Sequence, residues 1–540
     1  MFVPKRNITD LEQRAHVATA ATTVSSASRE SPLASRRLLL GGISLASLLY
    51  LLGLFYYAHL RPIDGDEGYY TTAARLVWEG KVPYRDFAYQ QSVLLPYIYS
   101  WIWEAYPKSL VAMRFLSGIC GAIAILLWGV WLVSSRRFST TVALATFAVI
   151  ICNPYWAWWN IAVKTFALAN LLASVTMICL FCALQTRKPY WHFVAGLALG
   201  ACASARALYA PLVPVVFLWL LQMEWRSKDG LKGTRAFLGG ATCGLLPMIV
   251  SFATGPKAFI FNNVSYRSLL SPHESLRHSV HVYLNNLISL LHHTYFVLTV
   301  LLALLGLLSL LRLRGGEHGP YNRKDYLFLQ LALLMLVVYV ATASIPFPVF
   351  DQYFTSPLLP FLVFFIAEGL RRCLLRFRMV ILLVLVIMLP LLFLQGIKGE
   401  SAEYAFTRNL QMDSFREVTK AVEANSREDD VVLSIWPGYV FESGRRYFPG
   451  SENQFNYDVG SKVSPEARSR YHLLSGTDVV DAISAGKMNV FVSSASKYYL
   501  DAIMPASERQ RMRSALDLNY SFIGNFDGVE IYRRREAIPK

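Results

Sequence analysis

The sequence has few charged residues and few cysteines for its length. Of 540 residues, 16% are charged, whereas a soluble domain has about 25%. The mean hydropathy of +0.37 therefore excludes a wholly soluble protein. None of the cysteines has metal-ligand spacing, and even the C-x-x-C pair Cys179 and Cys182 lacks a second pair or a histidine partner. We therefore expect no metal, no redox cofactor and no disulfide in the soluble part. The seven cysteines, all in or beside apolar segments, are Cys120, Cys152, Cys179, Cys182, Cys202, Cys243 and Cys373.

Basic residues outnumber acidic ones, and the formal net charge is +16. They stand in short clusters between apolar runs, which indicates membrane topology and argues against a nucleic-acid partner. Residues 1–37 are polar and lack the apolar core of a signal peptide. We expect this segment to be a disordered cytoplasmic tail. A Gly-rich phosphate-binding fingerprint is also missing: Gly438 and Gly444 have the wrong spacing.

Long apolar runs predict an α-helical, polytopic membrane protein with about eleven spans and an amphipathic first outer loop. Pro211 and Pro214 interrupt the fifth and sixth runs, which predicts either a broken helix beside a cavity or a structural kink. The transmembrane part occupies residues 38–397. The predicted spans are 38–60, 109–133, 138–153, 161–184, 192–208, 210–224, 236–254, 287–311, 326–345, 354–370 and 379–397.

Alternate loops differ in their basic residues, and this predicts the orientation. One set carries Lys or Arg at 36–37, 136–137, 187–188, 226–235, 312–324 and 371–378. In the opposite set, the short loops 154–160 and 346–353 carry none. The basic set should be cytoplasmic. We therefore predict a multi-pass protein of the cell (inner) membrane, with a cytoplasmic N-terminus and an extracytoplasmic outer loop at 61–108 and C-terminus.

Residues 398–540 change to mixed polar sequence and predict a soluble, extracytoplasmic α/β domain. We expect a helix over 413–424, a strand over 431–435 and a turn over 436–439. Thr477 is the expected cap of a helix that runs to Ile483 and stops before Gly486. Further strands are expected at 488–492 and 528–532. The domain is large enough for a core of its own.

The first outer loop combines acids with amphipathic segments. Asp64, Asp66 and Glu67 follow directly on the first span, and carboxylates so close to a membrane favour a water-filled cavity over lipid. Residues 69–78 have helical spacing, and 93–103 are apolar enough to lie along a membrane. The alternative is an ordinary solvated loop. We interpret 61–108 as a shelf at the membrane surface that presents acids beside a cavity.

The same residues carry a family resemblance. The string D-E-x-Y-Y-x-x-A-A-R-L, followed by E-G-x-V-P-Y-R-D-F, resembles the first outer loop of GT-C glycosyltransferases. Protein O-mannosyltransferases and lipid A aminoarabinose transferases are members of that superfamily. The resemblance is specific over residues 60–135. It implies a polyprenyl-phosphate-linked sugar donor, an acceptor hydroxyl on a lipid, glycan or protein, and transfer at the outer face with inversion.

The resemblance implies that Asp66 is the catalytic base. Glu67 would orient Asp66 or bind the acceptor, with a cap or a structural ion pair as the alternative. Two carboxylates in a partly dry site raise each other's pKa, which suits general-base catalysis. Asp64 is expected to be structural, and Tyr70 is an expected substrate contact.

The leaving phosphate needs a cation. Many relatives have a Lys-Pro-Pro-Leu element where this chain has Gln91-Ser92-Val93-Leu94, so Gln91 replaces the expected lysine. Lys164 and Arg206, at the predicted outer ends of spans, are the candidate replacements, with snorkelling anchors as the alternative. Further candidates on the shelf are Arg75, Lys81 and Arg85.

Other polar residues lie near the predicted outer face. Asp351 is a candidate sugar contact or a helix cap, and His292 and His293 fit packing better than ligation. A transporter or flippase of lipid-linked glycans is the main alternative function. Acids in the first outer loop, instead of at mid-membrane, argue against it.

Overall fold

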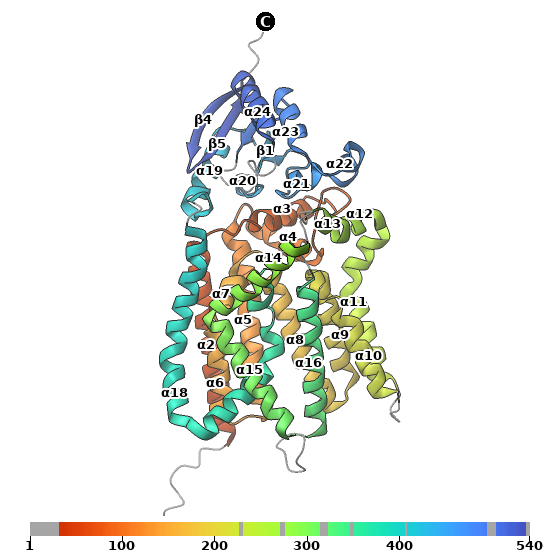
Figure 1. Cartoon of the computed structure of the whole chain (residues 1–540), viewed down its shortest axis with the longest axis vertical. Coiled ribbons are helices and arrows are strands. Elements are labelled where there is room, and N and C mark those ends of the chain that lie inside the picture. The colour runs from red at the N-terminus through yellow and green to blue at the C-terminus, as the bar shows by residue number, and fades with distance from the viewer. Residues whose placement is uncertain are drawn as a thin grey trace, which may run out of the picture.

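The computed structural model describes residues 32–225, 230–270, 276–313, 322–345, 350–405, 408–493 and 504–535. A bundle of long helices forms one end of the molecule and a smaller α/β domain the other (Figure 1). Most of the predicted N-terminal tail lies outside the described residues. The helices of the bundle are α2 (Pro32–Leu60), α5 (Leu110–Ser134), α6 (Thr140–Ile151), α7 (Pro154–Ile161), α8 (Thr165–Thr186), α9 (Pro189–Ala205), α10 (Leu212–Glu224), α11 (Lys232–Thr254), α15 (Thr294–Leu313), α16 (Arg323–Ala343) and α18 (Leu359–Ala405).

Eight helices in the described part are long and apolar enough to cross a membrane, or nine if the bent pair α6 and α7 is one span. The predicted number of about eleven is larger for two reasons. Helix α9, predicted as a span, has only 17 residues, about 25 Å of helix. The predicted spans at 354–370 and 379–397 both lie on α18, whose backbone leaves the helical region at Phe377. Figure 1 shows the chain turning at that end of the bundle.

Two breaks separate helices at the shelf end of the bundle. Helix α9 ends before Arg206, a short 3-10 turn follows (η2, Ala207–Tyr209), and Pro211 caps α10. Another break separates α7 from α8, because Ala162 and Lys164 are extended. The first break ends at Pro211, one of the two prolines that predicted a break or a kink, whereas Pro214 lies within α10. Both breaks bring a basic residue to the shelf end of the bundle.

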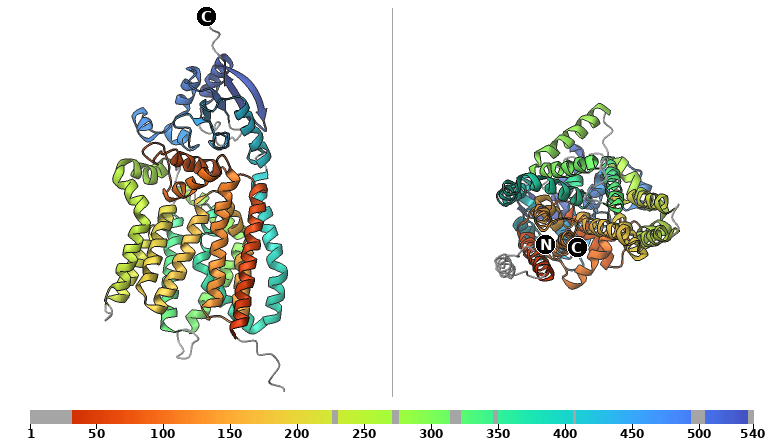
Figure 2. Two further views of the ribbon diagram at one scale, coloured as in Figure 1. Left: turned by 180° about the vertical axis from the view of Figure 1, so that it is seen from behind. Right: turned by 90° about the horizontal axis from the view of Figure 1, so that it is seen from below.

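The predicted shelf consists of α3 (Glu67–Trp78) and α4 (Leu94–Ala105). It lies between the bundle and the C-terminal domain (Figure 2). The shelf and the domain share one hydrophobic core, in which Tyr69 and Tyr70 of α3 pack with Trp436 and Tyr439 of the domain. The remaining helices beside the shelf are α12 (Pro256–Ile260), a π-helical turn η3 (Phe261–Ser265), α13 (Tyr266–Leu270), α14 (Leu276–Ser289), η4 (Leu290–His292) and α17 (Gln352–Thr355).

The C-terminal domain is built on a five-stranded mixed sheet in the order β2-β1-β3-β5-β4. Its first three strands are parallel, and β5 and β4 add an antiparallel hairpin. The elements are η5 (Arg408–Leu410), α19 (Met412–Ala424), β1 (Val431–Ser434), α20 (Gly438–Ser443), β2 (Arg446–Tyr447), α21 (Asn456–Gly460), α22 (Pro465–Tyr471), α23 (Gly476–Ser484), β3 (Val490–Val492), α24 (Ala506–Asn519), β4 (Tyr520–Phe526) and β5 (Val529–Arg534).

Two local predictions for this domain were wrong. The expected turn over 436–439 contains the first residues of helix α20. Ser475, not Thr477, caps α23, because Ser475 forms a reciprocal capping box with Asp478. The helix over 413–424 and the strands near 431, 490 and 529 were predicted correctly to within a few residues.

Candidate active site

The acidic loop leaves α2 at Leu60 and enters α3 at Glu67. Asp66 occupies the N-cap position of α3, where an aspartate ordinarily accepts a backbone N–H of the first turn. Its side chain makes no such capping hydrogen bond. Instead, its own backbone N–H donates to Asp64 Oδ1 at 3.0 Å. The Asp66 carboxylate is therefore directed away from the helix end.

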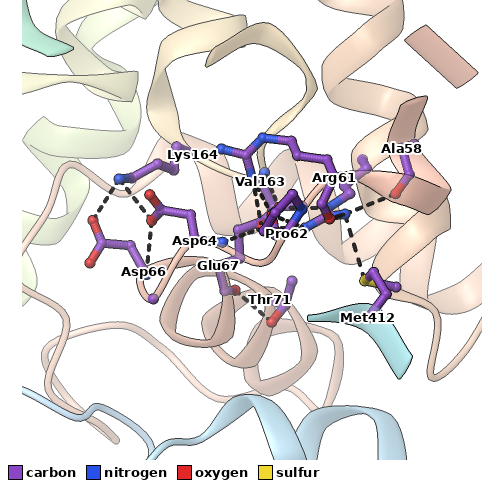
Figure 3. Close-up of polar contacts among 12 residues, drawn as sticks. Ala58, Arg61, Pro62, Asp64, Asp66, Glu67, Thr71, Val163, Lys164 and Met412 are labelled. Carbon is purple, nitrogen blue, oxygen red and sulfur yellow. Dashed lines mark hydrogen bonds and ion pairs between the residues drawn. The ribbon is translucent and has the colours of Figure 1, made fainter. Parts of the chain in front are cut away.

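Lys164 is the partner of both aspartates (Figure 3). Its Nζ lies 2.9 Å from Asp64 Oδ1 and 2.9 Å from Asp66 Oδ2, and it also donates to Gln352 Oε1 at 3.1 Å. The Lys164 and Asp64 side chains are almost fully buried, whereas one third of the Asp66 side chain is exposed. Of this trio, Asp66 is the acid that a substrate can reach.

The electrostatics of the trio follow from burial and close charges. Burial raises the pKa of the Asp66 carboxyl, and Asp64 adds to this effect, while Lys164 opposes it. Burial by itself would lower the pKa of Lys164, but the two carboxylates hold it above its ordinary value. Lys164 is therefore a permanent cation beside a carboxylate whose proton affinity is enhanced.

Glu67 points the other way, into the protein. Its carboxylate is fully buried and accepts from Arg114 at 2.6 and 2.9 Å, from Arg61 at 3.3 Å and from two backbone N–H groups, those of Asp64 and Val163. Although burial disfavours its charged form, Arg114 and Arg61 hold the pKa of the Glu67 carboxyl below its ordinary value. This arrangement is the structural ion pair that the sequence offered as the alternative for Glu67.

The ion pairs of Glu67 with Arg114 and Arg61 join several segments around the acidic loop. Arg114, on α5, also donates to the carbonyls of Ala58, Arg61 and Pro62 at the end of α2. Through Glu67 and the Val163 N–H, the same network reaches the break between α7 and α8. Glu67 therefore holds in register the two segments that carry Asp66 and Lys164.

A group of cations surrounds Tyr70, which lies one helical turn after Asp66 on α3. Lys164, Arg206 and Arg267 all act electrostatically on the Tyr70 hydroxyl, as does Asp66. Arg206 Nη1 donates to Thr165 Oγ1 at 2.8 Å, and its guanidinium lies 4.1 Å above the ring of Phe166. Arg267 hydrogen-bonds Tyr353 and is solvent-exposed. Tyr70, Lys164 and Arg206 were predicted, and the structure brings them together with Asp66.

The structure places the other predicted site residues elsewhere. Arg75 is buried between Trp103 and Tyr447 and is bound by Glu79 and by carbonyls of the C-terminal domain. Arg85 is exposed and paired with Asp86. These two shelf cations contribute to structure, because their partners are protein groups.

Two further predicted contacts have local partners of their own. Gln91 is half-buried, and its backbone carbonyl accepts a hydrogen bond from the Tyr84 hydroxyl at 2.6 Å. Asp351 caps α17 through the Gln352 N–H, the alternative role that the sequence left open. It also lies 2.7 Å from His293 Nε2. The His293 ring also packs edge-on against Tyr155, with ring centroids 4.9 Å apart, as the packing interpretation expected.

Sequence reasoning missed Arg267, Trp436 and Gln454 near the site. Arg267 lies on the short helix α13, and no sequence motif marks it. Trp436 and Gln454 belong to the C-terminal domain, yet each donates to the Gly65 carbonyl, at 2.7 and 3.0 Å respectively. No signal in the local sequence could connect residues so distant along the chain.

Comparison with solved structures identifies the fold. The structure of ArnT from Cupriavidus metallidurans bound to undecaprenyl phosphate superposes with a TM-score of 0.58 at 13% identity, covering 91% of this chain and 98% of that one. The apo form of ArnT gives 0.56 at 13% identity with the same coverage. The Archaeoglobus fulgidus oligosaccharyltransferase with Zn and sulfate aligns with a TM-score of 0.46 at 12% identity, covering 91% of this chain and 73% of that chain. No curated protein matches the sequence.

The polytopic helical bundle with its C-terminal α/β domain therefore belongs to the structural class of ArnT-like membrane folds. Within that class, residues 90–252 match the family of dolichyl-phosphate-mannose-protein mannosyltransferases. The family resemblance and the fold class that the sequence predicted are confirmed.

Proposed function

We propose that this protein transfers a sugar from a polyprenyl-phosphate donor to an acceptor hydroxyl, with Asp66 as the general base and inversion at the anomeric carbon. The observation that carries the proposal is the grouping of one accessible carboxylate, Asp66, with Lys164, Arg206 and Arg267. A base for the acceptor and cations for a leaving phosphate are the two requirements of such a transfer. ArnT, which shares this fold, was solved with undecaprenyl phosphate bound.

In the proposed step, Asp66 takes the proton of the acceptor hydroxyl while that oxygen attacks the anomeric carbon. The bond from this carbon to the phosphate oxygen breaks, and its electron pair leaves with the polyprenyl phosphate. Negative charge therefore builds up on the phosphate as Asp66 becomes neutral. Burial and Asp64 raise the proton affinity of Asp66, which favours its protonation. The cations favour the build-up of negative charge on the phosphate.

Arg206 and Arg267 are the proposed phosphate contacts. Arg206 is buried at the break that follows α9, and Arg267 is exposed at the rim. Both lie beside Tyr353: Arg206 at 5.0 Å from its ring, Arg267 in hydrogen-bond contact. A guanidinium can bind two phosphate oxygens at once. Lys164, whose ammonium is already shared by two aspartates, sets the charge state of Asp66 and adds to the field.

The acceptor remains open among a lipid, a glycan and a protein. Near Asp66, the buried hydroxyls of Tyr69 and Tyr89 and the amide oxygen of Gln454 have no hydrogen-bond partner in the described part of the chain. The two tyrosine rings stack at 5.1 Å. Unpaired hydroxyls on aromatic rings complement the polar edges and apolar faces of a sugar.

The test is complementation of a deletion strain, with mass spectrometry of its envelope lipids and glycans. We expect one sugar modification to disappear on deletion and to return with the wild-type protein. Asp66→Asn removes the base and keeps the shape, so turnover should fall by roughly 10² to 10⁴. The control is Asp86→Asn, a shelf aspartate paired with Arg85, which should restore the modification. Full restoration by a membrane-inserted Asp66→Asn protein would overturn the assignment.

A further inference from the structure

The C-terminal domain contacts the backbone of the acidic loop between its two aspartates. Trp436 Nε1 donates to the Gly65 carbonyl at 2.7 Å, and Gln454 Nε2 donates to the same oxygen at 3.0 Å. Trp436 follows strand β1, and Gln454 lies in the segment before α21. The Gly65 carbonyl thus accepts two hydrogen bonds, one for each of its lone pairs, and both come from the C-terminal domain.

Two neighbouring contacts make this attachment rigid. The Ile63 N–H donates to the Leu410 carbonyl at 2.8 Å, which ties the start of the loop to the segment between α18 and α19. Gly68 faces the Trp436 ring so closely that an added Cβ would lie 2.7 Å from Cε2 of the indole. The domain therefore contacts the loop before, at and after the Asp64–Asp66 pair.

The opposite side of the loop is held by the bundle. Lys164 binds the two carboxylates, and Glu67 is locked by Arg114 and Arg61. With the carboxylates bound from one side and the Gly65 carbonyl from the other, the peptide groups next to Asp66 have little freedom to rotate. The direction of the Asp66 carboxylate depends on both attachments.

We propose that Trp436 and Gln454 are positioning residues for Asp66, so that the C-terminal domain completes the active site. This proposal rests on the function proposed above for Asp66. Neither residue needs to touch a substrate to act: each fixes the carbonyl immediately before the base. Loss of the two hydrogen bonds should misdirect Asp66 and slow the chemical step, because catalysis is sensitive to displacements of about 1 Å.

The experiment compares Trp436→Phe, Gln454→Met and the double variant in the full-length protein. Each substitution keeps an apolar or unbranched side chain of similar length and removes the donor. Transfer is measured across a titration of undecaprenyl-phosphate-linked sugars, with mannose as the first probe. We expect the double variant to lose at least tenfold in kcat, with the donor KM within twofold of wild type. The matched control is Tyr439→Phe, since Tyr439 packs on Trp436 but its hydroxyl donates to Asn409. Its kcat should not change.

Hydrogen exchange gives a readout that does not depend on transfer. The amides of residues 63–67 should exchange at least tenfold faster in the double variant, while those of the helical bundle keep their wild-type protection. If the wild-type protein transfers no sugar from any polyprenyl-phosphate donor, the function fails, and the exchange data still test the attachment. Wild-type kcat and wild-type exchange in a folded double variant would overturn the proposal. If that variant does not fold, each single variant decides in the same way.

Discussion

The Lys164 ammonium lies 2.9 Å from Asp66 and 2.9 Å from Asp64, although five helices, α3 to α7, separate them along the chain. The extended residues between α7 and α8 make this contact possible, because they direct Lys164 toward the shelf instead of along a span. The charge state of the proposed base therefore depends on a residue from the bundle.

Replacement of Lys164 by alanine should change the pH dependence of transfer. Without the cation, Asp66 keeps the burial and the neighbouring Asp64 that raise its pKa and loses the charge that lowers it. A base acts when deprotonated, so the acid limb of the kcat/KM profile should move to higher pH. Lys164→Arg should move it less. An acid limb unchanged in Lys164→Ala would contradict the contact.

Glu67→Gln should mainly reduce stability. The substitution leaves two buried guanidiniums, those of Arg61 and Arg114, without a counter-charge. Breaking such a pair costs roughly 3–5 kcal/mol. In matched detergent, the unfolding temperature should fall much more for Glu67→Gln than for Asp66→Asn. In Asp66→Asn, Lys164 still pairs with Asp64. Equal unfolding temperatures would show that Glu67 is not the structural anchor.

Arg206→Ala and Arg267→Ala should weaken donor binding and turnover together. Arg206→Lys should recover only part, because lysine cannot reproduce the two-pronged guanidinium contact. Binding of undecaprenyl phosphate can be titrated directly, with Arg85→Ala as the control because Arg85 is exposed and paired with Asp86. If both alanine variants bind like wild type, the phosphate site lies elsewhere.

The C-terminal domain should become less stable as the pH rises toward 7. Burial raises the pKa of Glu452 to about 7 from an ordinary value of 4.5. The folded state thus holds a proton that the unfolded state releases, so stability is highest below pH 4.5 and falls between 4.5 and 7. Glu452→Gln removes this penalty and should stabilise by about 3 kcal/mol at pH 8, with no gain at pH 4.5. Thermal-shift measurements at pH 4.5 and pH 8 test this prediction. The control is Glu428→Gln, because Glu428 is exposed.

The proposed orientation rests on the asymmetry of basic residues between loops. Reporter enzymes active only outside the cytoplasm should work when fused after Lys108 or Lys398 and stay inactive after Arg137 or Lys232. The shelf and the C-terminal domain lie at the same end of the molecule (Figure 1), so both outer fusions should agree. Activity after Lys398 only would contradict the predicted side of the shelf.

The sequence by itself determined the class of protein and the location of its acids. Apolar runs of span length must be helical in a membrane, because only a helix satisfies every backbone group within one segment. The acid-rich string after the first span carried the family resemblance, and prolines at 211 and 214 predicted the break near Arg206. These features are local, and each can be understood from a few consecutive residues.

The tertiary structure decided which acid is accessible and what surrounds it. Asp66 and Glu67 are adjacent in sequence, yet at the start of α3 adjacent side chains point in different directions, and so one meets Lys164 and the other Arg114. Arg75 was a further candidate for the phosphate, after Arg206 and Lys164, but packing of the C-terminal domain on the shelf enclosed Arg75. The contacts of Gly65 with Trp436 and Gln454 join residues that only folding brings together, since no periodicity or spacing connects side chains across a whole membrane domain.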